Sequence, residues 1–273
     1  MTVCLKAAHE SMRSIILFLF TVSFLFSQTN SKIQTAYQKA LLYYEQKNFD
    51  GALAEILTVF SDAKDHKEMR ILAAHCSYHK KDYSAALRYF REAWALDKKN
   101  DQINFDIYNI LILQEQYREA RRSLRGLIAH KKKNDETVHP EYFMLLGKTE
   151  LLMGKPDSAL ESLRLAKKDA DAKLKPELIQ LEARALIALG EFDSAEIALS
   201  WAESLGDSKS SIELLRLQLR EVKAARAHEL NKVTQELRLG YEALANDKNP
   251  EVKKSAELAL ERLKIKSSNA STP

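Results

Sequence analysis

Glycine and proline are scarce in this chain, with 7 and 5 among 273 residues. All-β sandwiches and barrels need many glycine- and proline-containing turns, so this scarcity argues against them and favours long helices. Hydrophobic residues make up 45% and charged residues 29%, which excludes a wholly disordered chain. The net charge is only +4, and lysine and arginine are interspersed with acidic residues. Nothing in this balance indicates a nucleic-acid partner.

Catalytic motifs are also lacking. The chain has no glycine-rich phosphate loop, no Gly-x-Ser-x-Gly and no His-Glu-x-x-His. We therefore expect no enzyme and no cofactor. The closest constellation is His75 and His79, four residues apart and so on one face of a helix. With a third ligand such as Glu45 or Glu68 the two histidines could hold a metal, although their spacing matches no structural zinc site.

Only two cysteines occur, Cys4 and Cys76. Cys4 lies in residues 1–28, which read as a secretory signal because basic residues precede an apolar run over 14–26 and a polar exit follows. The apolar run is short for a membrane span, which needs roughly 17–25 residues, but an uncleaved anchor stays an alternative. Cys76 would then be the one cysteine of the mature chain, and a packed apolar role suits it better than a redox role.

An internal repeat is the main feature of the sequence. An alanine recurs at intervals of 34, 34, 39 and 36 residues. An aromatic residue or proline stands three positions before each alanine, a large apolar residue stands four after, and a small residue mostly stands twelve before. Offsets of four and seven place apolar groups on one helix face, so each copy predicts two helices that approach closely at small residues. The repeated alanines are Ala52, Ala86, Ala120, Ala159 and Ala195.

This pattern resembles the tetratricopeptide repeat family, a 34-residue helix–turn–helix unit. The resemblance is clearest at Leu146-Gly147, Gly154, Ala159, Leu163 and Ala166 and in the segment 82–93. It implies an all-α, right-handed superhelical solenoid of about five units with C-terminal capping helices. Tyr108 stands where the other units have a small residue, so we expect the third unit to pack more loosely. The expected units are 33–66, 67–100, 101–134, 140–173 and 176–209, which together span 33–209.

The register of the repeat fades after Gly206. Residues 210–266 still read as helical, with a helix start at Asn249-Pro250-Glu251. Solenoids need an atypical terminal unit to cover the last repeat, so we interpret this segment as a cap. Residues 267–273 are a polar tail that we expect to be disordered.

In proteins similar to this family, the first helix of each unit lines a concave groove that receives a peptide or helix. Family members that bind chaperones clamp a carboxylate with a lysine–asparagine pair in the first unit. Tyr37 and Leu41 stand there instead, so a chaperone adaptor is not expected. The early part of the groove is aromatic and the later part offers cations, which predicts a partner with apolar and acidic side chains. The candidate groove residues are Tyr37, Tyr44, His75, Tyr78, His79, Phe105, Asn109, Lys148 and Arg184.

Together these features predict a non-enzymatic protein–protein interaction scaffold of the cell envelope, periplasmic or secreted. Two alternatives stay open: a membrane-tethered assembly factor held by residues 14–26, and a metal-binding or catalytic protein that uses His75 and His79. The sequence predicts other proteins as partners and does not identify them.

Overall fold

The computed structural model describes residues 30–206 and 208–269, with side chains placed up to residue 264. These residues form helices and turns, with no strand among them. The expected signal segment, with its apolar run over 14–26, and the end of the expected tail lie outside the described residues. Within the described residues, no helix is both long enough and apolar enough to cross a membrane.

The chain divides into two compact units, Met1–Glu115 and Gln116–Pro273, called unit 1 and unit 2 below. The division lies inside the segment 101–134 that was expected to form the third repeat, the one with Tyr108 at a small-residue position. Unit 1 contains a helix described over residues 30–45 and then α2 (Phe49–Val59), α3 (Lys67–His79), α4 (Tyr83–Leu96) and α5 (Asp101–Leu113).

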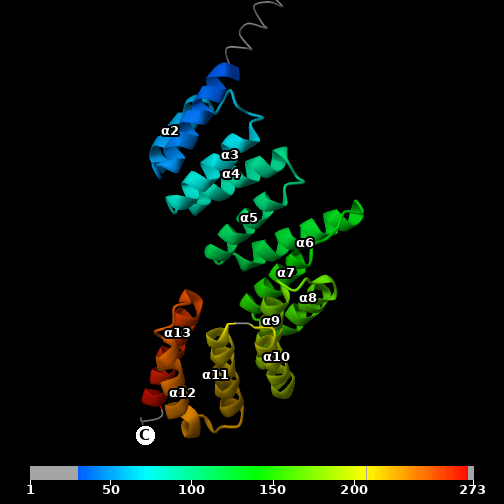
Figure 1. The fold of residues 1–273 in the computed structure, drawn as a ribbon, viewed down its shortest axis with the longest axis vertical. Coiled ribbons are helices and arrows are strands. Elements are labelled where there is room, and N and C mark those ends of the chain that lie inside the picture. Colours follow the sequence, from blue (N-terminus) through cyan, green and yellow to red (C-terminus); the bar gives the residue numbers. More distant parts are fainter. Residues whose placement is uncertain (1–29, 207, 270–273) are drawn as a thin grey trace, which may run out of the picture. The chain divides into compact units, whose positions relative to one another are not determined.

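Unit 2 contains the remaining helices, which lie side by side with their chain neighbours (Figure 1). They are α6 (Tyr117–Lys133), α7 (Pro140–Leu152), α8 (Pro156–Asp169), α9 (Lys175–Leu189), α10 (Phe192–Ser204), α11 (Lys209–Arg226), α12 (Leu230–Leu244) and α13 (Pro250–Asn269). The expectation of an all-α fold built from helical hairpins is confirmed.

The repeated small residues lie where the helices of a hairpin meet. All five alanines of the repeat are fully buried, and so are Ala40, Ala74 and Ala183 twelve positions before three of them. Gly147 holds the equivalent place in α7, where a Cβ atom would come within 2.7 Å of Leu163. Small side chains at these positions thus let the axes of the two helices approach each other. Large apolar residues one turn later in the second helix fill the core.

One turn geometry joins the two helices of most hairpins. The residue two positions before the second helix has a positive φ at Lys47, Lys81, Glu115, Gly154 and Gly190. At four of these turns the next residue donates a 2.9 Å backbone hydrogen bond to the carbonyl five positions earlier. This is the pattern of a Schellman helix end.

The same turn occurs between α11 and α12. His228 has φ 57°, and the N–H of Glu229 bonds the carbonyl of Ala224 at 2.9 Å. The repeat register that fades in the sequence after Gly206 is therefore continued by the backbone of this hairpin. Glu221 and Val233 occupy the positions at which the earlier repeats have small residues. The repeated sequence pattern alone therefore does not reveal the α11–α12 hairpin.

Candidate protein-binding surfaces

Unit 1 carries the aromatic part of the expected binding groove, and much of it packs between helices. The His79 ring stacks on Phe49 with centroids 4.6 Å apart and planes 9° from parallel. The Tyr44 hydroxyl lies 3.2 Å from His79 Nε2. These contacts tie α3 to the preceding hairpin. Sequence reasoning missed this role because the three residues come from three different helices.

His75 contacts α4, whereas His79 contacts α2. The His75 ring packs edge-on against Phe90 of α4 with centroids 5.1 Å apart. Burial lowers the pKa of His75, while the nearby Asp106 carboxylate on α5 acts in the opposite direction and His79 adds to the lowering. Burial also raises the pKa of Asp106, and His75 opposes that change. The two histidines of the expected metal pair thus lie against different helices.

The described residues contain no group of three or more histidine, cysteine, aspartate or glutamate side chains placed to hold a metal ion. Cys76, between the two histidines, is fully buried, and burial raises the pKa of its thiol to about 11. A protonated, covered thiol is a poor nucleophile and a poor metal ligand. This part of α3 therefore has the chemistry of a packed helix.

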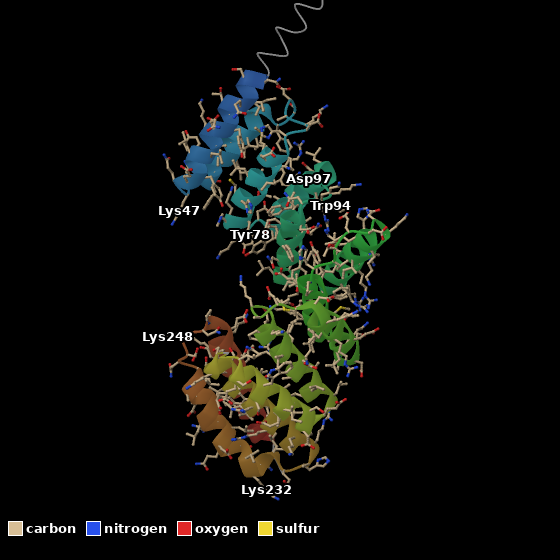
Figure 2. All side chains as sticks on the ribbon, turned by 45° about the vertical axis from the view of Figure 1, so that its right-hand side comes forward. Lys47, Tyr78, Trp94, Asp97, Lys232 and Lys248 are labelled. Carbon is tan, nitrogen blue, oxygen red and sulfur yellow. The ribbon has the colours of Figure 1, made fainter. Side chains whose placement is uncertain are left out.

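Other side chains of the expected groove in unit 1 reach the solvent. Tyr78 is 37% exposed at the surface of α3 (Figure 2), beside the ring of Tyr83 at 5.7 Å. Asn109 is exposed on α5, and Phe105 on the same helix is half-buried. Tyr37 is half-buried, with its ring 5.0 Å from that of His66. An exposed tyrosine is a suitable contact for a protein segment.

In unit 2 the structure brings Lys148 and Arg184 together in one pocket of about 260 Å³. Both are on first helices of hairpins, α7 and α9, and the pocket is completed by α11 and the start of α13. Lys148 also pairs with Glu177 at 3.6 Å. The other residues that line the pocket are Glu177, Gln180, Leu181, Ser208, Ser211, Asn249 and Glu251.

The electrostatics of this pocket are mixed. Arg184 is solvent-exposed, yet protein surrounds it on several sides, as happens on a concave surface. Removal of water lowers the pKa of its guanidinium, and Glu251 and Glu177 act in the opposite direction. Arginine stays charged at any physiological pH. The pocket can therefore pair a carboxylate through Lys148 and Arg184 and accept hydrogen bonds at its own two glutamates.

Comparison with known proteins supports the repeat architecture. Two family models, each described as tetratricopeptide repeat, match residues 37–101 and 77–149. Comparison with curated proteins gives no significant match.

Several solved structures share the fold at low identity. The apo form of RapI is 12% identical, covers 91% of this chain and 80% of its own, and has a TM-score of 0.61. PilF of Pseudomonas aeruginosa is 18% identical over 85% of this chain and 99% of its own, with a TM-score of 0.53. PilW, a type IV pilus biogenesis factor, is 15% identical over 83% and 97%, also with a TM-score of 0.53. Residues 37–149 therefore match tetratricopeptide repeat models, and the chain shares the fold of these solved structures.

Proposed function

We propose that this chain is a non-enzymatic scaffold that binds other proteins through the first-helix faces of its repeats. Stacked helical hairpins create extended surfaces that suit a peptide or helix of a partner. The observation that carries the proposal is the pocket on α7, α9 and α11. It places two cations from different repeats, Lys148 and Arg184, on the same open surface.

In this proposal the two units contribute different chemistry. Tyr78, Phe105 and Asn109 offer aromatic and amide contacts in unit 1, with Tyr37, Tyr44, His75 and His79 forming the packed surround. Lys148 and Arg184 offer paired donors for a carboxylate in unit 2. Unit 1 therefore suits apolar side chains of a partner, and unit 2 suits acidic ones.

The proposed location is the cell envelope, after export by the signal in residues 1–28. The same fold occurs in PilW, a type IV pilus biogenesis factor, which supports an assembly role there. Sequencing of the N-terminus of the mature protein tests export: a chain that starts near Thr29 supports release, and an intact N-terminus supports an anchor.

The binding surface is tested by affinity capture from an envelope extract with a variant that carries Tyr78→Ala, Asn109→Ala, Lys148→Ala and Arg184→Ala. We expect the captured partner to be lost. The control carries Lys232→Ala and Arg238→Ala on α12, which removes a lysine and an arginine from exposed ion pairs elsewhere. Equal capture by both variants, with unchanged helicity, would contradict the proposal.

A further inference from the structure

A second pocket in unit 2 lies between α6, α7 and α8 and has a volume of about 260 Å³. Apolar side chains form part of its walls, two cations stand beside them, and Glu161 and Ser162 also line it. This volume is below the roughly 300–1,000 Å³ of pockets that hold small molecules, and it suits one large side chain. The residues that matter are Ile128, Phe143, Leu146, Leu165, Arg125 and Lys132.

Leu165 is the exposed part of the apolar wall. Its side chain is 47% exposed although its neighbours in α8, such as Leu163 and Ala166, are buried. Phe143 is half-buried beside it in the pocket, and the Lys132 ammonium lies 5.4 Å from the Phe143 ring centre. This small open apolar surface offers a contact for one apolar side chain of a partner.

Helix α6 has a high positive charge, and two of its cations, Arg125 and Lys132, line this pocket. Over Tyr117–Lys133 it contains seven lysines and arginines and one acidic residue, Glu119, a net +6 for the helix against +4 for the whole chain. Arg125, Lys132 and Lys133 are exposed. The chain therefore concentrates its positive charge on this helix, and the rest of the sequence is slightly acidic.

A hydrogen bond to the protein fixes the position of the Arg125 guanidinium. Its NH2 group donates to Oε1 of the fully buried Glu150 at 3.1 Å, while 54% of its side chain stays exposed. A guanidinium has five N–H donors in a planar fork, so the group keeps donors for a second carboxylate. A cation whose position is already fixed loses little conformational entropy on binding.

This pocket is distinct from the one that contains Lys148. Leu146 and Lys148 are two residues apart on α7, a rotation of about 200° around the helix axis. Residues of α9 and α11 line the pocket that contains Lys148, whereas residues of α6 and α8 line the pocket that contains Leu146.

We propose that the α6–α8 pocket is a second docking site, for a protein segment in which acidic side chains flank one bulky apolar side chain. The apolar side chain enters between Phe143 and Leu165, and the carboxylates pair with Arg125 and Lys132. Charge complementarity with the basic helix α6 is the reason that the partner segment is acidic. The apolar wall formed by Ile128, Phe143 and Leu165 favours a protein segment over a membrane surface or a nucleic acid, because neither of these offers a single bulky side chain.

The test uses the full chain and a panel of short fluorescent peptides in which acidic residues surround a central Leu, Phe, Met or Trp. Matched peptides carry Ala at the centre or Lys in place of the acidic residues. We expect saturable binding to at least one peptide with an apolar centre, weaker binding at high salt, and about tenfold weaker binding to its Ala-centred match.

The variants Leu165→Asp and Lys132→Glu are expected to weaken peptide binding about tenfold. Leu152→Asp is the matched control for the first, because Leu152 is 46% exposed on α7 outside the pocket. Lys168→Glu, exposed on α8, is the control for the second. Adding Leu165→Asp to the variant Lys148→Ala, Arg184→Ala should still weaken peptide binding about tenfold, which separates this site from the proposed groove.

Anionic phospholipid vesicles and a single-stranded oligonucleotide complete the experiment. If no peptide binds more tightly than its Ala-centred match, or if Leu165→Asp binds as well as Leu152→Asp, the docking site is wrong. Binding of vesicles or oligonucleotide alone, with dependence on Lys132 and Lys168 alike, would also overturn it.

Discussion

Two glutamates in unit 2 are buried inside hydrogen-bonded networks that the sequence did not reveal. Glu150 on α7 accepts from Arg121 Nε at 2.9 Å, from Arg125 at 3.1 Å and from the Ser162 hydroxyl at 2.7 Å, so it joins α6, α7 and α8. Glu221 accepts from the Tyr241 hydroxyl at 3.0 Å and from Arg262 at 3.3 Å, and so joins α11, α12 and α13. Burial raises the pKa of Tyr241, and the Glu221 carboxylate adds to the rise. Each carboxylate thus ties three helices together.

The two sides of the Glu150 network should respond unequally to mutation. Replacing both arginines in Arg121→Ala, Arg125→Ala leaves a fully buried carboxylate without cations, which should lower the free energy of unfolding by about 3–5 kcal/mol. Glu150→Gln keeps the shape and leaves the arginines partly hydrated, so about 1–3 kcal/mol is expected. Urea denaturation measures both. An exposed control, Glu161→Gln, should change stability by less than about 0.5 kcal/mol, and equal losses for both network variants would contradict this explanation.

His75 should make stability depend on pH. Its pKa is lowered by burial in the folded protein, whereas the unfolded chain titrates near about 6.5. As the pH falls through about 6.5, the unfolded state gains the proton first, so the free energy of unfolding should decrease. Asp106 titrates at lower pH, where its raised pKa acts with the opposite sign. Urea denaturation between about pH 7.5 and 5.5 should show this decrease in the wild type and a smaller one in His75→Gln; identical slopes would refute the assignment.

At the scale of the helix and its turn, one position in most hairpins requires a left-handed backbone. Gly154 and Gly190 occupy it in two repeats, and Lys47, Lys81 and Glu115 occupy it in the others with φ of 57–63°. Residues other than glycine lose roughly 1 kcal/mol in this conformation. The repeat tolerates either choice because the hydrogen bonds of the helix end fix the backbone.

Exchanging residues at this position should therefore change stability in a set direction. Lys81→Gly should raise the free energy of unfolding by about 0.5–1 kcal/mol, and Gly154→Ala should lower it by about 1 kcal/mol. No atom lies within 4 Å of a Cβ built on Gly154, so only the backbone conformation opposes the alanine. Thermal unfolding of both variants measures the effect, and a stabilising Gly154→Ala would show that the turn relaxes.

Two glycines inside helices should respond in opposite ways to alanine. Gly126 is exposed on α6 and a Cβ there would meet no atom within 4 Å, so Gly126→Ala should stabilise by about 0.5–1 kcal/mol through helix propensity. At Gly147 the Cβ would lie 2.7 Å from Leu163 and 3.2 Å from the carbonyl of Ala159. Gly147→Ala should destabilise by about 1–3 kcal/mol, because it overpacks the contact of α7 with α8. Chemical denaturation compares the pair, and like signs would contradict the close-approach argument.

For the whole molecule, the sequence predicted what depends on local periodicity. The recurring alanines predicted the helical hairpins, because each hairpin needs a small residue at the same position where its two helices meet. Sequence reasoning missed ion pairs between residues that are far apart in the sequence. Glu150 and Arg121 are 29 residues apart, and Glu221 and Arg262 are 41 residues apart. Lys148 and Arg184 were expected on a groove, whereas Ser208, Asn249 and Glu251 were not expected beside them, because they lie at the starts of α11 and α13, outside the recognised repeat.

The division at Glu115 makes a further prediction for the whole chain. Unit 2 has its own cores, formed along α7 to α10 and along α11 to α13, so a fragment of residues 116–273 should fold by itself. We expect a helical circular dichroism spectrum and a cooperative unfolding transition. As an internal control, Glu150→Gln should cost the same free energy in the fragment as in the full chain. A fragment that unfolds without cooperativity would show that the unit depends on residues 1–115.

The Glu150 network has a mechanical consequence. In a stack of hairpins, tension on the chain ends is resisted locally, and hairpins should peel away one after another. The hairpin of α7 and α8 is clamped to α6 by two arginines and a serine that converge on one carboxylate. Under stretching it should therefore yield later than the hairpin of α9 and α10, which has no buried charged residue among those that the structure describes.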